Sequence, residues 1–120
     1  MNFKKLFNSL KYAICGIKTA LKEEQTFRLE LLIAVLVIAI SFYLNLQMIE
    51  KAIIFITIFL VLSLELVNSL IERISDMVCS SLDKRIKKIK DIGGGIVLFS
   101  CFMAAVIGII IFLPYLLKVL

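Results

Sequence analysis

Four polar residues follow the middle hydrophobic run of this chain at helical spacing. They are Glu65, Asn68, Glu72 and Asp76, separated by three, four and four positions. At about 100° per residue, this spacing places the four side chains within roughly 80° of one helix face and over about 16 Å of helix axis. Carboxylates at the edge of a membrane segment are costly to keep there, so they indicate a functional site. We call these four residues the polar stripe.

Other ionisable residues are expected at the same membrane boundary, just before the first apolar run: Glu24, Arg28 and Glu30. A hard cation such as Mg²⁺ takes carboxylate oxygens as ligands, keeps several waters and bridges substrate phosphates. Two carboxylates from different helices would supply such a site. Glu65 lies deepest, at the end of the apolar run. A carboxylate at that depth, beside a lipid headgroup, is placed to accept a proton from a hydroxyl.

A second group of residues, Lys90-Asp91-Ile92-Gly93-Gly94-Gly95, opens the third apolar run. Glycines let a backbone or a phosphate approach closely, and the amides of a helix N-terminus favour anions. Glycines also serve close packing of membrane helices, which is their commoner role. Lys90 adds a mobile cation and is the best candidate for a phosphate contact. Because the sequence contains no GxxxxGK[ST] phosphate loop, any nucleotide would be bound by a different architecture.

The elements that must position these groups are membrane helices. The 120 residues are 62% hydrophobic, and the mean hydropathy of +1.06 is far above that of soluble domains. The uncharged runs 31–49 and 92–117 are long enough to cross about 30 Å of hydrocarbon as helices, whereas 52–64 must continue through Glu65 to do so. We therefore predict an all-α membrane protein, one domain over 1–120, with transmembrane helices at about 26–47, 50–79 and 91–117.

The N-terminal segment has apolar residues at helical spacing, among them Phe3, Leu6, Phe7 and Leu10, with lysines between them. This pattern predicts an amphipathic helix over about 3–22 that lies in the membrane interface. The pattern does not resemble a cleaved signal peptide, which would have one apolar run. A solvated helix packed on the rest of the protein is the alternative.

Charge predicts the orientation of the spans. Of the 14 Lys and Arg residues, six precede the first span and six lie from Arg73 to Lys90, whereas only Lys51 and Lys118 lie on the other side. By the positive-inside rule, the N-terminus and the segment from about 79 to 91 are cytoplasmic, and the turn at 45–51 and the C-terminus are outside. The net charge of +5 thus reflects topology and attraction for anionic lipid or phosphate, and no nucleic-acid partner is expected.

Each polar group also has a structural interpretation. Glu24 could pair with Arg28 across one helical turn, and Glu72 with a nearby cation. Asn68 could link helices by hydrogen bonds, as could a protonated Glu65. A purely structural stripe would require all of these interpretations to hold together.

In this order, the residues resemble the small bacterial diacylglycerol kinase family, which includes the undecaprenol kinases, over about residues 5–115. The resemblance is carried by three motifs: Glu24-x-x-Phe27-Arg28-x-Glu30, then Glu65-x-x-Asn68-Ser69-x-Ile71-Glu72-x-x-x-Asp76, then Lys90-Asp91 followed by small residues. One departure lies in the cytoplasmic loop, where relatives commonly have Glu-Tyr-His and this chain has Ser81-Leu82-Asp83.

The resemblance implies an ATP-dependent lipid phosphotransferase of the bacterial cytoplasmic (inner) membrane. It also implies a homotrimeric helical bundle whose active sites are shared between subunits. By that likeness, Glu65 is the general base for the lipid hydroxyl, and Glu24 and Glu72 hold Mg²⁺ on the ATP phosphates. The matching nucleotide-binding or phosphate-binding positions are Asn68, Asp76, Lys90 and Asp91. Arg28 and Glu30 belong to a motif with a supporting role.

The expected activity is phosphorylation of diacylglycerol to phosphatidic acid, because Phe27-Arg28-x-Glu30 resembles the diacylglycerol-using members. The alternative is an undecaprenol kinase that produces undecaprenyl phosphate. A different class of function is a non-enzymatic channel or scaffold subunit in which the polar stripe lines a pathway. The effect of Glu65→Gln on phosphoryl transfer separates the enzyme from the channel.

Overall fold

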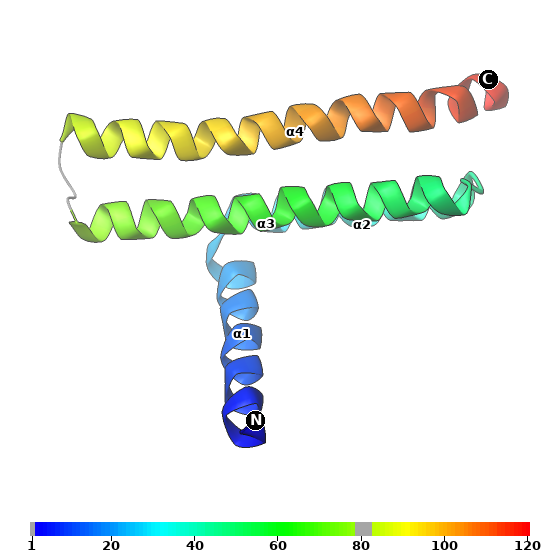
Figure 1. The fold of residues 1–120 in the computed structure, drawn as a ribbon. Coiled ribbons are helices and arrows are strands. Elements are labelled where there is room, and N and C mark those ends of the chain that lie inside the picture. The colour runs from blue at the N-terminus through cyan, green and yellow to red at the C-terminus, as the bar shows by residue number, and fades with distance from the viewer. Residues whose placement is uncertain (1, 79–82) are drawn as a thin grey trace.

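The computed structural model describes residues 2–78 and 83–120, which are built almost entirely from helices (Figure 1). The helices are α1 (Phe3–Glu23), α2 (Gln25–Tyr43), α3 (Met48–Val78) and α4 (Lys84–Val119). The last three are long and apolar enough to cross a membrane. The predicted fold class, an N-terminal helix followed by three membrane-spanning helices, is confirmed.

Two helix ends differ from the predicted ones. α2 ends at Tyr43 instead of near residue 47, because Asn45 adopts a positive φ of 54° that a helix cannot continue through. α4 begins at Lys84, ahead of the predicted 91, because the Asp83 carboxylate accepts from the Arg85 N–H at 2.8 Å and caps the helix. The Arg85 guanidinium also holds the pKa of Asp83 below its usual range. The predicted end of the second span at residue 79 lies outside the described residues.

α3 packs along α4 and also contacts α2 (Figure 1). Near the start of α3 and the end of α4, the interface is apolar and centres on the buried side chains of Leu46, Ile54 and Ile111. The Tyr115 hydroxyl donates to Glu50 at the same end. This end therefore has an ordinary hydrophobic core.

The other half of α3 buries different side chains. Its buried residues there are Glu65, Asn68, Ser69 and Ser75, and the neighbouring part of α4 buries Gly93 and Ser100. Small and polar residues let membrane helices approach closely and interact through polar groups. The polar stripe thus begins inside the helix packing and runs out of it.

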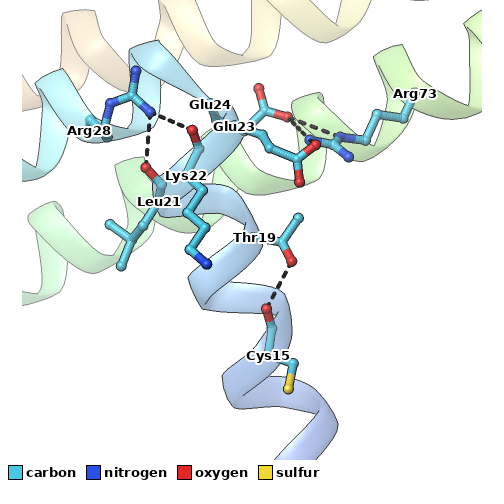
Figure 2. A network of polar contacts seen from close by, with 8 residues as sticks. All are labelled: Cys15, Thr19, Leu21, Lys22, Glu23, Glu24, Arg28 and Arg73. Atoms are coloured by element: carbon cyan, nitrogen blue, oxygen red, sulfur yellow. Dashed lines mark hydrogen bonds and ion pairs between the residues drawn. The ribbon is translucent and has the colours of Figure 1, made fainter.

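α1 leaves the bundle crosswise at Glu24, whose extended conformation (φ −107°, ψ 101°) separates α1 from α2 (Figure 1). Figure 2 shows how this corner is held: Arg28 Nη1 donates to the carbonyl oxygens of Leu21 at 3.0 Å and Lys22 at 2.8 Å. These carbonyls end α1 and would otherwise lack intrahelical partners. Arg28 therefore fixes the direction in which α1 leaves the membrane helices.

Replacing Arg28 should loosen this corner. We expect Arg28→Ala to remove both capping bonds, at a cost of about 1 kcal/mol each, and to fray the last turn of α1. Hydrogen exchange followed by mass spectrometry would show faster exchange of the amides of residues 20–24. Lys18→Ala, which removes a charge from α1 without removing a cap, is the matched control. Unchanged protection in Arg28→Ala would contradict the capping role.

Candidate active site

The polar stripe crosses from the buried part of α3 to its exposed end. Glu65 and Asn68 are 7% and 9% exposed, whereas Glu72 and Asp76 are exposed. Between them is the level at which α1 meets α3, where the two helices enclose a cavity of about 350 Å³ lined by Glu24, Ser69 and Arg73 among others. The polar stripe therefore extends to both sides of the level at which α1 meets α3.

α4 covers the deep half of the stripe through Gly93. A Cβ atom at this position would collide with Asn68 Oδ1, whereas Gly94 and Gly95 have nothing within 4 Å. Among the three glycines, Gly93 is the one at which close helix packing within the described residues leaves no room for a Cβ atom. A single chain thus covers Glu65 and Asn68 by itself, so association is not needed to remove these two residues from lipid.

The side-chain amide of Asn68 makes one hydrogen bond within the polar stripe. Its Nδ2 donates to Glu72 Oε1 at 3.4 Å, a long hydrogen bond. Its Oδ1 is buried and has no hydrogen-bond partner within the described part of the chain. Asn68 therefore does not link helices by a hydrogen bond there, and its carbonyl oxygen faces Gly93 of α4.

Glu30 approaches the stripe from α2. Its Oε2 is buried without a partner among residues 2–78 and 83–120, and the side chain lies near enough to Glu65 for the two charges to interact. Glu30 also lines a cavity of about 250 Å³ between α2, α3 and α4, which is otherwise largely apolar and includes Thr57 and Cys101. One carboxyl group, that of Glu30, therefore lines an apolar cavity in the membrane segment and lies within interaction range of Glu65.

Glu24 reaches the stripe from the α1–α2 corner and is held by Arg73 of α3 (Figure 2). Arg73 donates to Glu24 Oε1 from Nε at 3.0 Å and from Nη2 at 2.8 Å. The interpretation in which Glu24 pairs with Arg28 is wrong, because Arg28 caps α1 instead. Glu72 and Glu24 are both near enough to Glu65 for their charges to act on it.

From the sequence, Arg73 is assigned only to the positive charges that predict the orientation of the spans in the membrane. A signal was present, because Arg73 directly follows Glu72 and a helix places it about 100° around from the stripe. What the sequence could not show is that α1 ends on that side of α3.

Lys90 brings α4 to the exposed end of the stripe. Its Nζ donates to Asp76 Oδ1 at 2.9 Å, and the charge of Glu72 also acts on it. Asp91 is paired differently, with Lys87 of its own helix at 2.7 Å. The structure thus gathers Glu24, Glu65, Asn68, Glu72, Asp76 and Lys90, while Arg28 and Asp91 are engaged elsewhere. Ser81 and Leu82, where the chain departs from its relatives, lie outside the described residues.

The donor groups suit a hard divalent cation. No group of three His, Cys, Asp or Glu side chains that could hold a metal occurs in the described ranges. Mg²⁺ does not need one, since it is commonly held by one or two carboxylates together with waters and phosphates. Glu24 and Glu72 are two such carboxylates, one from the α1–α2 corner and one from α3. Arg73 engages one of the two Glu24 oxygens, Oε1, so Glu24 would share its negative charge between Arg73 and the ion.

Comparison with known proteins gives matches over most of the chain. A family profile described as "Prokaryotic diacylglycerol kinase" matches residues 11–112. The chain is 34% identical over 108 residues to a diacylglycerol kinase of Haemophilus influenzae, covering 89% of this chain and 92% of that protein. It is 33% identical over 110 residues to an undecaprenol kinase of Bacillus subtilis, covering 92% and 89%. A diacylglycerol kinase of Escherichia coli is 26% identical, over 87% and 85%.

The packing at Gly93 gives a test of the site geometry. We expect Gly93→Ala to displace the Asn68 amide and lengthen its bond to Glu72, which destabilises the protein by about 1 to 3 kcal/mol. Thermal unfolding in detergent would show the lower midpoint. Gly94→Ala and Gly95→Ala add the same methyl group in open space and should leave the midpoint nearly unchanged. Equal effects of all three substitutions would show that the α3–α4 contact does not depend on Gly93.

Proposed function

Since the chain belongs to the prokaryotic diacylglycerol kinase family, we propose that it is a membrane lipid kinase. In this proposal it transfers the γ-phosphoryl group of ATP to the hydroxyl of diacylglycerol, giving phosphatidic acid and ADP. The observation that carries the proposal is the polar stripe, which runs from a buried carboxylate in the membrane segment to exposed charged groups beyond α1. A lipid hydroxyl and a soluble nucleotide can both reach such a stripe.

Glu65 acts as the general base in this reaction. The lipid oxygen forms a bond to the γ-phosphorus, the bond from that phosphorus to the bridging oxygen of ADP breaks, and the hydroxyl proton passes to the Glu65 carboxylate. Glu65 is the deepest member of the stripe and is buried, so it meets a hydroxyl that stays in the membrane. Glu30 lies beside it and orients the same headgroup.

The remaining residues serve the nucleotide. Glu24 and Glu72 would hold Mg²⁺, Asn68 would lie beside the nucleotide, and Lys90 would move from Asp76 to the phosphates. When bound, Mg²⁺ neutralises phosphate charge and aligns the transferred group. Phosphoryl transfer depends mainly on positioning and charge stabilisation, so a few side chains on helix ends suffice. Asp76 and Asp91 keep the lysines of α4 in place until nucleotide arrives.

The choice of diacylglycerol depends on the motif Phe27-Arg28-x-Glu30. In the structure, Phe27 is buried and Arg28 caps α1, so Glu30 is the member that reaches the apolar cavity. Relatives named for each lipid match the chain at nearly equal identity. Undecaprenol is therefore the alternative substrate that the assay must include.

The surroundings of the enzyme follow from its charges and its family. We propose that α1 and the start of α4 lie on the cytoplasmic side of a bacterial inner membrane, a topology that their lysines favour by the positive-inside rule. The exposed hydrophobic side chains of α2 and α4 face lipid or other copies of the chain. We propose the homotrimer that the family resemblance implies, with active sites shared between subunits.

Purified protein in mixed micelles should phosphorylate diacylglycerol when supplied with MgATP. We expect turnover of diacylglycerol to exceed that of undecaprenol at equal mole fraction, measured by transfer of labelled phosphate to the lipid. Turnover of undecaprenol without any of diacylglycerol would reverse the choice of substrate. Turnover of neither lipid would contradict the kinase proposal.

Glu65→Gln should lower kcat by about 10² to 10⁴-fold, because the amide cannot accept the proton. Thermal unfolding and self-association should stay close to those of the unaltered protein, since glutamine has the same shape. Glu50→Gln makes the same change at the other end of α3, about 22 Å away along the helix, and should retain activity. Full activity in Glu65→Gln would refute the general-base role.

A further inference from the structure

Arg73 and Glu24 form a two-point ion pair at the centre of the proposed site. Both Arg73 nitrogens, Nε and Nη2, donate to the same Glu24 oxygen at 3.0 and 2.8 Å, and Glu23 Oε1 lies 3.7 Å from Nη2 (Figure 2). The Arg73 side chain is 45% exposed and that of Glu24 is 23% exposed. The pair therefore lies open to solution on one side.

A contribution to folding stability is a weak explanation for the Arg73–Glu24 ion pair. A partly exposed ion pair contributes little to folding, because water screens it and two long side chains must be ordered. The α1–α2 corner beside it is already held by Arg28 through two carbonyls of α1. The pair does, however, occupy the carboxylate that is proposed to bind the metal ion.

Two cations would then compete for Glu24. A guanidinium bound to the carboxylate opposes the approach of a divalent ion through its charge. Once Glu24 turns to the ion, Arg73 is left beside Glu72 on the same helix, at the place where ATP phosphates would lie. A planar guanidinium matches the oxygens of a phosphate through two parallel hydrogen bonds, which a lysine cannot do.

We propose that Arg73 is a positioning residue that exchanges partners during the reaction cycle. Without nucleotide it holds the Glu24 carboxylate at the α1–α3 contact, and with MgATP it releases Glu24 and donates to phosphate oxygens. This inference rests on the proposed kinase function, because it assigns the released guanidinium to ATP. The exchange couples metal binding by Glu24 to phosphate binding by Arg73.

Metal affinity without nucleotide tests the first half of the exchange. Binding of Mn²⁺ alone to the full-length protein can be followed by electron paramagnetic resonance. We expect Arg73→Gln to bind Mn²⁺ about twofold to fivefold more tightly, the factor that corresponds to losing one partly exposed ion pair. In a Glu24→Gln background, Arg73→Gln should have no further effect on Mn²⁺ affinity. Unchanged or weaker Mn²⁺ binding in Arg73→Gln would overturn the exchange.

Steady-state kinetics test the second half. Arg73→Gln should raise KM for MgATP about tenfold or more, with a smaller change in kcat, because a charge-assisted phosphate contact is lost. Arg73→Lys keeps the charge and should give Mn²⁺ affinity near that of the unaltered protein but an elevated KM. Arg85→Gln removes an arginine whose side chain is 90% exposed and should change neither quantity by more than about twofold. A KM unchanged in both Arg73 variants would overturn the phosphate contact.

Different results would contradict the kinase function and the partner exchange of Arg73. Absence of lipid phosphorylation by the unaltered protein would overturn the kinase function and, with it, the assignment of Arg73 to ATP. An active enzyme in which Arg73→Gln leaves Mn²⁺ affinity unchanged would overturn only the exchange. Circular dichroism of each variant establishes that the helices are intact, and Arg73→Lys provides the test if Arg73→Gln does not fold.

Discussion

The cost of placing carboxylates at the edge of a hydrocarbon layer governs this structure. Glu65 is buried in a membrane segment, and such a group persists only where protein covers it. Part of the cover of this stripe comes from α4, which approaches α3 closely because Gly93 has no Cβ atom to meet Asn68. If α4 were farther away, lipid would reach Asn68. The α3–α4 contact therefore helps to keep the deep half of the stripe out of lipid.

This constraint divides the bundle into two unlike halves. The half that contains Leu46, Ile54 and Ile111 has an apolar core, and the other half packs through serine, asparagine and glycine. Packing and apolar contact at one end stabilise the helices, which leaves side chains at the other end available for chemistry. The corner at Glu24 then directs α1 across the boundary between the two environments.

Much of this architecture could be predicted from the sequence. A bilayer requires apolar helices of a certain length, and it favours positively charged residues on one side of the membrane. The uncharged runs predicted three membrane helices, and the spacing of Glu65 to Asp76 predicted one helix face. The contacts that complete the site could not be predicted in this way. Whether Gly93, Gly94 or Gly95 faces α3 depends on the rotation of α4, and the Arg73–Glu24 pair depends on where α1 ends. The role of Arg28 was missed because its partners are backbone carbonyls, which no residue pattern marks.

Pairing of charges separates the groups of the site into two kinds. Glu24 and Asp76 each have a cation within 3 Å, at 2.8 and 2.9 Å, so the nucleotide-free site is nearly neutral there and inexpensive at a membrane surface. Glu65 and Glu30 have no ion pair within the described residues, although they lie deeper, where an unpaired charge costs most. Glu24 and Lys90, which are proposed to exchange partners when nucleotide binds, are thus found paired, whereas the proposed general base Glu65 is not. In the proposed reaction this division follows depth along α3, because the lipid hydroxyl would approach from the membrane side and ATP from the cytoplasm.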